Sequence, residues 1–169
     1  MITNQILKLF PEPIFKYKFD NSKEINTELS KYIYDLRDKD TDGVKRSNKG
    51  GWHSQNFKLT EKNSIQLKFA LKIQPYIIDV FQNFGWKIKN KNIRISEMWA
   101  IINKKDDFNV IHTHPNCYLS AAYYVKAGKD CGKFEVEHPN NAKKYSFPEI
   151  EKRNELNLEV ASIEIEEGD

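Results

Sequence analysis

The chain has 169 residues, which is long enough for one domain with a sizeable hydrophobic core. Its formal net charge is +3 and its pI is near 8.7, and acidic and basic residues alternate along the sequence. Mixed charge of this kind is typical of a solvated surface and argues against a dedicated nucleic-acid-binding stripe.

Residues 1–10 lack the basic region, apolar core and small-residue cleavage site of a signal peptide, and no apolar run approaches membrane-spanning length. The two cysteines, Cys117 and Cys131, lack a metal-type spacing, and a short secreted domain usually carries more. We therefore expect reduced, partly buried thiols. The sequence predicts a cytoplasmic protein with no membrane partner.

The first third of the chain predicts a strand followed by a helix. Residues 14–19, "IFKYKF", alternate apolar and polar side chains after a turn at Pro11 and Pro13. The period then changes, and a helical stripe follows, made of Ile25, Leu29, Tyr32, Ile33 and Leu36. Asn21 and Glu24 have the spacing of a capping pair, with Ser22 as an alternative cap. Residues 39–51 are polar and contain glycine, which indicates a loop.

A second helix is predicted over residues 61–84, with Thr60 as its N-cap and Gly85 as its stop. Its apolar face consists of Ile65, Phe69, Ile73, Ile77 and Val80. Pro75 lies inside this pattern and would either kink the helix or divide it in two.

Beyond Gly85 the pattern favours strands, in residues 92–103, 108–125, 132–139 and 158–167. Most helical signals precede most strand signals. That order predicts an α+β domain whose sheet can fold into a sandwich.

Two of the four histidines stand in one His-Thr-His motif, at positions 112 and 114. Side chains two apart in a strand point to the same face, so His112 and His114 would project together. Neutral imidazoles suit Fe(II), Zn(II) and similar ions. The alternative is two polar residues that face solvent or bond to each other, and the spacing alone does not decide between these readings.

A second strand signal, "YLSAAYYVK", follows the histidines. Ser120, Ala122 and Tyr124 share one of its faces. Small residues beside a tyrosine hydroxyl would leave room for a ligand that the hydroxyl holds. Ordinary packing of tyrosine in a sheet is the alternative explanation.

Four stretches of the sequence carry a family resemblance: "LFPEPIFKYKF", "GGWHSQNFKL", "EMWAIINKKDDFNVIHTHPN" and "LSAAYYVK". Together they resemble iron- and 2-oxoglutarate-dependent dioxygenases of the prolyl-hydroxylase type. The likeness is closer to a family of 2-oxoglutarate and Fe(II) oxygenases common in marine bacteria and their phages. The resemblance implies one domain over residues 1–169, an α+β double-stranded β-helix (jelly roll) with N-terminal helices packed outside.

The resemblance also implies roles for individual residues. His112 matches the first iron ligand, and His114 stands where the wider superfamily usually has Asp. Iron held by two histidines and one carboxylate needs an acid somewhere, so the ligand set stays open. Tyr124 matches a contact to the far carboxylate of 2-oxoglutarate, and Ser120 and Asn103 would lie near the same co-substrate.

Other family features have no assigned role or depart from the pattern. The Trp52, His53 and Ser54 motif matches the family, yet the sequence gives it no function, and a packed tryptophan at a loop end is the simpler explanation. The family pattern continues beyond Gly168-Asp169 with a distal histidine and an arginine, so we expect the last strands to be missing. His138 reads as a surface residue, and Glu135 and Glu137 are available acids that no spacing requires as ligands.

The activity implied by the resemblance uses Fe(II), 2-oxoglutarate and O₂ to hydroxylate an unknown substrate, releasing succinate and CO₂. Two alternatives belong to other classes. One is a non-catalytic jelly-roll binding module or truncated remnant, and the other is a cupin-like metal protein. The cupin reading ranks last, because the acid expected soon after His-x-His is absent from residues 115–118.

Overall fold

The computed structural model describes residues 4–88, 93–140 and 148–169. Its elements in chain order are α1 (Ser22–Lys39), β1 (Asn48–Lys49), β2 (Trp52–His53), α2 (Ile65–Asn83), β3 (Ile101–Ile102), β4 (Phe108–Asn109), β5 (Phe134–Glu137) and β6 (Val160–Ile163). In this described part of the chain the strands form three antiparallel pairs, β1–β4, β2–β3 and β5–β6. Helices with small antiparallel sheets are compatible with the predicted α+β class, while the closed jelly roll stays a prediction.

Helix α1 confirms the predicted apolar stripe. Leu29 is buried, and Ile25 and Ile33 pack against the same core. The cap differs from the prediction, because Asn21 occupies the N-cap position but its side chain makes no capping hydrogen bond.

Helix α2 begins later than the sequence suggested. Ser64, rather than Thr60, is its cap and accepts a hydrogen bond from the Leu67 N–H at 3.4 Å. The physical reason is Asn63, whose φ of 62° is left-handed and cannot continue a right-handed helix. Pro75 lies inside one continuous helix, so the division is not observed. Gly85, with a φ of 66°, follows the helix as predicted.

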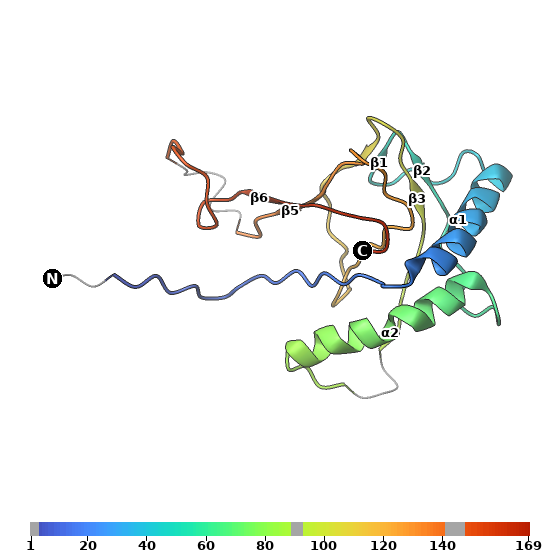
Figure 1. Cartoon of the computed structure of the whole chain (residues 1–169), viewed down its shortest axis with the longest axis horizontal. Helices are drawn as coiled ribbons and strands as arrows, with labels where there is room; N and C mark the ends of the chain where they lie inside the picture. Colours follow the sequence, from blue (N-terminus) through green and yellow to red (C-terminus); the bar gives the residue numbers. More distant parts are fainter. Residues whose placement is uncertain (1–3, 89–92, 141–147) are drawn as a thin grey trace.

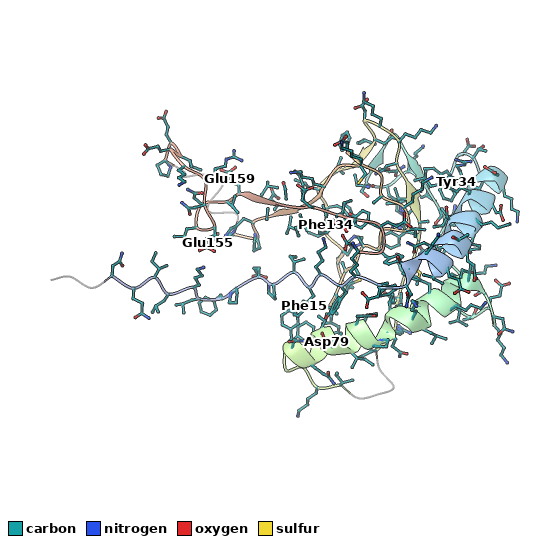
Figure 2. The ribbon with its side chains drawn as sticks, in the orientation of Figure 1. Phe15, Tyr34, Asp79, Phe134, Glu155 and Glu159 are labelled. Carbon is teal, nitrogen blue, oxygen red and sulfur yellow. The ribbon has the colours of Figure 1, made fainter. Side chains whose placement is uncertain are left out.

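The N-terminal segment 14–19 keeps the predicted alternation but forms no regular ladder. Phe15, Tyr17 and Phe19 turn toward α2, and their rings contact Phe84 at 5.5 Å and Tyr76 at 5.0 and 5.1 Å. Figure 2 shows Phe15 beside the half of α2 that carries Asp79. The predicted alternation of inward and outward side chains is therefore confirmed, but no strand forms in this segment.

The C-terminal segment lies between two stretches that are distant in sequence. The Phe19 N–H donates to the Gly168 carbonyl at 3.0 Å, and the Gly168 N–H donates to the Tyr124 carbonyl at 2.8 Å. The Tyr124 N–H in turn donates to the Asp169 carbonyl at 3.0 Å. These bonds join the N-terminal segment, the Tyr-Tyr-Val stretch and the C-terminal segment around one core.

Of the two strand signals predicted within residues 108–125, only a short part forms a strand. Only Phe108–Asn109, strand β4, belongs to a ladder. A turn follows, in which Asn116 has a φ of 65°, and the Tyr124 backbone makes two hydrogen bonds to the C-terminal segment.

Strands β5 and β6 confirm the last two strand predictions and form an arm that extends from the helices (Figure 1). The N-terminal segment runs in the same direction, and Lys8 forms an ion pair with Glu155 at 2.6 Å. The chain exposes 14076 Å² in total. A compact monomer of this mass would expose about 8,700 Å².

Two predictions about the surface have different outcomes. Cys117 and Cys131 are free thiols, but both are exposed, so the expectation of partial burial is wrong. Within the described ranges no helix combines the length and apolarity that crossing a membrane requires.

Candidate functional site: a histidine pair beside a stacked tryptophan

The histidine pair follows directly from strand β4. This strand pairs with β1 through Asn48–Asn109 and Lys49–Phe108, and the Val110 N–H extends the pairing to the Ser47 carbonyl at 2.9 Å. The chain then leaves the ladder, and the His-Thr-His motif begins after the exposed Ile111.

The structure brings the two imidazoles into contact. The ring centroids of His112 and His114 are 4.8 Å apart, with the planes at 67°. Nδ1 of His112 lies 2.7 Å from the Val110 carbonyl oxygen, which can only accept a hydrogen bond. A proton on Nδ1 therefore leaves the Nε2 lone pair free, the arrangement typical of a metal-binding histidine. His112 is exposed and His114 half-buried, so both can be reached from solvent.

These residues fit part of an iron site. Bonds from a metal ion to imidazole nitrogen are about 2.0–2.1 Å for zinc and similar ions, and a centroid separation of 4.8 Å is compatible with two rings that share one ion. In residues 4–88, 93–140 and 148–169, no group of three or more His, Cys, Asp or Glu side chains is arranged to hold a metal. The pair thus offers two candidate nitrogen ligands, and among the described residues no carboxylate is arranged with them as a third.

Three further residues that the sequence did not require as ligands, Glu135, Glu137 and His138, lie on or directly after strand β5. Glu135 is exposed on β5 and accepts a hydrogen bond from the Ser162 hydroxyl at 3.1 Å. His138 lies at the end of the same strand, and its Nδ1 accepts a hydrogen bond from the Asn140 N–H at 3.0 Å. Both contacts belong to the β5–β6 arm. Glu137 is also on β5.

The adjacent tyrosines Tyr123 and Tyr124 have separate environments. Tyr123 contacts Phe19 and Phe69 in the core. Tyr124 is half-buried, and burial, followed by the nearby Cys131 and Asp169, raises the pKa of its hydroxyl. Tyr124 therefore stays protonated and can donate to a carboxylate.

A hollow of about 480 Å³ lies near the backbone partners of Tyr124 and is lined by residues 127–133 and 164–167. Its ionic groups include Lys133, which pairs with Glu164 at 2.8 Å. That bond raises the pKa of Lys133. The hollow is thus polar, and its Lys133 ammonium group is engaged in an ion pair with Glu164.

Ser120 and Asn103 are not brought to Tyr124. Ser120 is exposed, and the side-chain oxygen of Asn103 lies against Gly51, across the β2–β3 ladder. Among the described residues, no hydrogen bond joins either side chain to Tyr124 or to the histidine pair. Their role as co-substrate contacts stays a prediction.

The Trp-His-Ser motif is buried, as a packed tryptophan requires. It is connected to the histidine pair through one intermediate ring, that of Trp99. Trp52 donates from Nε1 to the Asp40 carbonyl at 2.6 Å, and the Ser54 hydroxyl oxygen accepts the Ala100 N–H at 2.9 Å. His53 is only 2% exposed, and burial lowers its pKa.

Trp99, which the sequence analysis did not single out, connects His53 to the pair. Its ring stacks on His53 at 5.6 Å and on His114 at 5.5 Å. Strand alternation is the sequence signal that could have identified this contact. Trp99 lies two residues before Ile101, the ladder partner of His53, so Trp99 and Ile101 share a face of the sheet.

Comparison with known proteins finds a similarity to one described family of oxygenases. A family model described as "Putative 2OG-Fe(II) oxygenase" matches residues 97–169. No curated protein and no solved structure matches the chain. The matched residues contain Trp99, the histidine pair and Tyr124, so this part of the chain is similar to the 2-oxoglutarate and Fe(II) oxygenases.

Proposed function

We propose that the protein is an iron- and 2-oxoglutarate-dependent dioxygenase that hydroxylates a substrate not yet known. The observation that carries the proposal is the contact between His112 and His114, with Nδ1 of His112 anchored by a backbone carbonyl. The oxygenase family model matches the same residues, which supports iron as the metal and 2-oxoglutarate as the co-substrate.

In this proposal His112 binds iron through Nε2, and His114 provides the second imidazole. Bound iron and 2-oxoglutarate together supply the activation of O₂, with succinate and CO₂ as products. The chain positions these groups. The hydrogen bond to the Val110 carbonyl fixes the tautomer of His112. The Tyr124 hydroxyl, whose pKa is raised by burial, would donate to the far carboxylate of the co-substrate.

We assign this activity to a single domain that includes both helices. Tyr123, next to the proposed co-substrate contact, packs against Phe19 and Phe69 and bonds to Asn26 of α1. Displacing either helix would therefore disturb the backbone that carries Tyr124.

The test is an anaerobic titration of the protein with Fe(II) and 2-oxoglutarate, in which iron-to-co-substrate charge-transfer absorption is measured. We expect an absorption band in the unaltered protein and none in His112→Ala. His138→Ala is the matched control, because the hydrogen bonds of that histidine are to Asn140 and Glu159, and it should retain the band. Tyr124→Phe should weaken 2-oxoglutarate binding more than iron binding.

Two results would contradict the proposal. Absence of the band from the unaltered protein would favour the alternative of a non-catalytic binding module. A band that persists equally in His112→Ala would show that the metal binds elsewhere. Where the band forms, release of succinate after O₂ is admitted would establish turnover.

A further inference from the structure

The rings of His53, Trp99, His114 and His112 form a continuous column, which we call the ring column. Its successive centroid separations are 5.6, 5.5 and 4.8 Å. The column runs from a buried residue to an exposed one, since His53 is 2% exposed, Trp99 and His114 are half-buried, and His112 is exposed. It therefore links the core to the proposed metal site.

The inner end of the column is fixed by strand geometry. His53 is the ladder partner of Ile101, so Trp99 is its diagonal neighbour on the same face of the sheet. Diagonal neighbours in an antiparallel pair are close enough for large rings to meet. The rings of His53 and Trp99 are nearly parallel, with an interplanar angle of 13°.

Hydrogen bonds clamp the two strands at this position. The Ser54 N–H donates to the Ala100 carbonyl at 2.9 Å, and the Ala100 N–H donates to the Ser54 hydroxyl oxygen, also at 2.9 Å. His53 is held as well, because its Nδ1 lies 2.7 Å from the Ser54 carbonyl oxygen. Trp99 thus stacks on a histidine that is buried and held by a hydrogen bond.

The two proposed ligands are oriented by different means. His112 is anchored by its hydrogen bond to the Val110 carbonyl. His114 makes no hydrogen bond within the described part of the chain, and its aromatic neighbours are Trp99 and His112. Metal-binding histidines are usually held by a hydrogen bond from the other ring nitrogen. For His114 the stacked indole is the available restraint.

We propose that Trp99, supported by the buried His53, is a positioning residue that orients the His114 imidazole for metal binding. This inference rests on the proposed function, because it assumes that the histidine pair binds a metal. It extends that proposal by giving the Trp-His-Ser motif a role: His53 stacks on Trp99, which in turn stacks on the proposed metal ligand His114.

The first part of the test uses the metal-free protein. We would record NMR spectra of the histidine ring protons and assign those of His114 by their loss in His114→Gln. Stacking on an indole should shift these protons upfield. We expect Trp99→Ala to abolish the shift and Trp99→Phe to retain part of it, while circular dichroism and thermal unfolding confirm that both variants fold.

The second part measures affinity for Co(II) by isothermal titration calorimetry under anaerobic conditions. Loss of a group that orients a ligand typically weakens metal binding 10- to 100-fold, so we expect about a tenfold loss in Trp99→Ala and less in Trp99→Phe. Trp86→Ala is the matched control, because Trp86 contacts Phe81, Phe84 and Tyr118 instead of the histidines. It should bind Co(II) as the unaltered protein does.

The outcomes separate this inference from the proposed function. Failure of the unaltered protein to bind Co(II) would overturn the proposed function together with the inference. Equal Co(II) affinity in the unaltered protein and in folded Trp99→Ala would overturn the inference alone. The same conclusion would follow if the His114 resonances were identical in both proteins.

Discussion

The Tyr123 hydroxyl donates a 2.6 Å hydrogen bond to Oδ1 of Asn26, which joins residues 97 positions apart in the chain. Asn26 lies on α1 and is 3% exposed, and its amide nitrogen also donates to Glu167 at 3.4 Å. One buried side chain thus connects the first helix, the segment after the histidine pair and the C-terminal segment. This relationship explains how the helices can support a site built mainly from later residues.

We expect Tyr123→Phe to lower the free energy of unfolding by about 1–3 kcal/mol, because it leaves the buried Asn26 carbonyl oxygen without its donor. Urea unfolding followed by circular dichroism would measure the change. Tyr118→Phe is the control, since Tyr118 is 86% exposed and makes no side-chain hydrogen bond within the described structure. Equal stability of Tyr123→Phe and the unaltered protein would show that this bond contributes little.

Tyr17 makes the protein sensitive to alkaline pH. Burial, followed by the hydrogen bond to Asp79, raises its pKa from 10.0 to about 12. The raised pKa means that the folded state keeps the hydroxyl proton longer than the unfolded state does. The resulting stability is fully present below pH 10 and is lost as the pH rises through about 12. Urea midpoints between these values should fall more steeply for the unaltered protein than for Tyr17→Phe.

Asp79→Asn separates the two causes of the Tyr17 shift. It removes the charged acceptor while burial of the ring remains, so the Tyr17 pKa should fall only part of the way toward 10.0. Tyrosinate absorbance during an alkaline titration would follow the group directly. An unchanged titration curve in Asp79→Asn would contradict a contribution from the carboxylate.

His53 should have the opposite dependence, at acidic pH. Burial lowers its pKa below 6.5, so the unfolded state binds the proton first as the pH falls. The corresponding stability is present above pH 6.5 and is lost as the pH falls through the lowered folded value. His53→Phe keeps a ring beside Trp99 but cannot titrate, and its unfolding free energy should change less across this range. Parallel pH profiles for the two proteins would contradict the prediction.

The parts of the fold that local periodicity determines could be predicted from the sequence. The stripe of α1 and the inward side chains Phe15, Tyr17 and Phe19 follow from spacing alone. The start of α2 was missed, because the left-handed conformation of Asn63 is a single-residue feature inside an otherwise helical pattern. The extent of the ladders depends on partners far away in sequence, which explains why most of the strand structure predicted within residues 108–125 is not observed.

The candidate site shows the same division. The spacing predicted that His112 and His114 project together from a strand; their rings are in contact, but they lie outside the β4 ladder. The stacking of Trp99 depends on the register of β2 with β3 and on the return of the chain after β4, and no local pattern contains that information. The Trp-His-Ser motif therefore gained an interpretation only when its spatial neighbours were known.

The last prediction concerns Gly50, in the turn between β1 and β2. Its φ is 69°, and an added Cβ would collide with the side-chain oxygen of Asp107, whose carboxylate accepts the Lys104 N–H at 2.8 Å. Gly50→Ala should therefore destabilise the protein by about 1 kcal/mol or more, and displacing the β1–β4 pair should also weaken Co(II) binding by the histidines. Urea unfolding and calorimetry would measure the two effects.

Gly128→Ala is the matched control, because Gly128 has no atom within 4 Å of an added Cβ and no left-handed φ. Equal unfolding free energies and equal Co(II) affinities in Gly50→Ala and Gly128→Ala would show that the turn at Gly50 does not position the histidine pair.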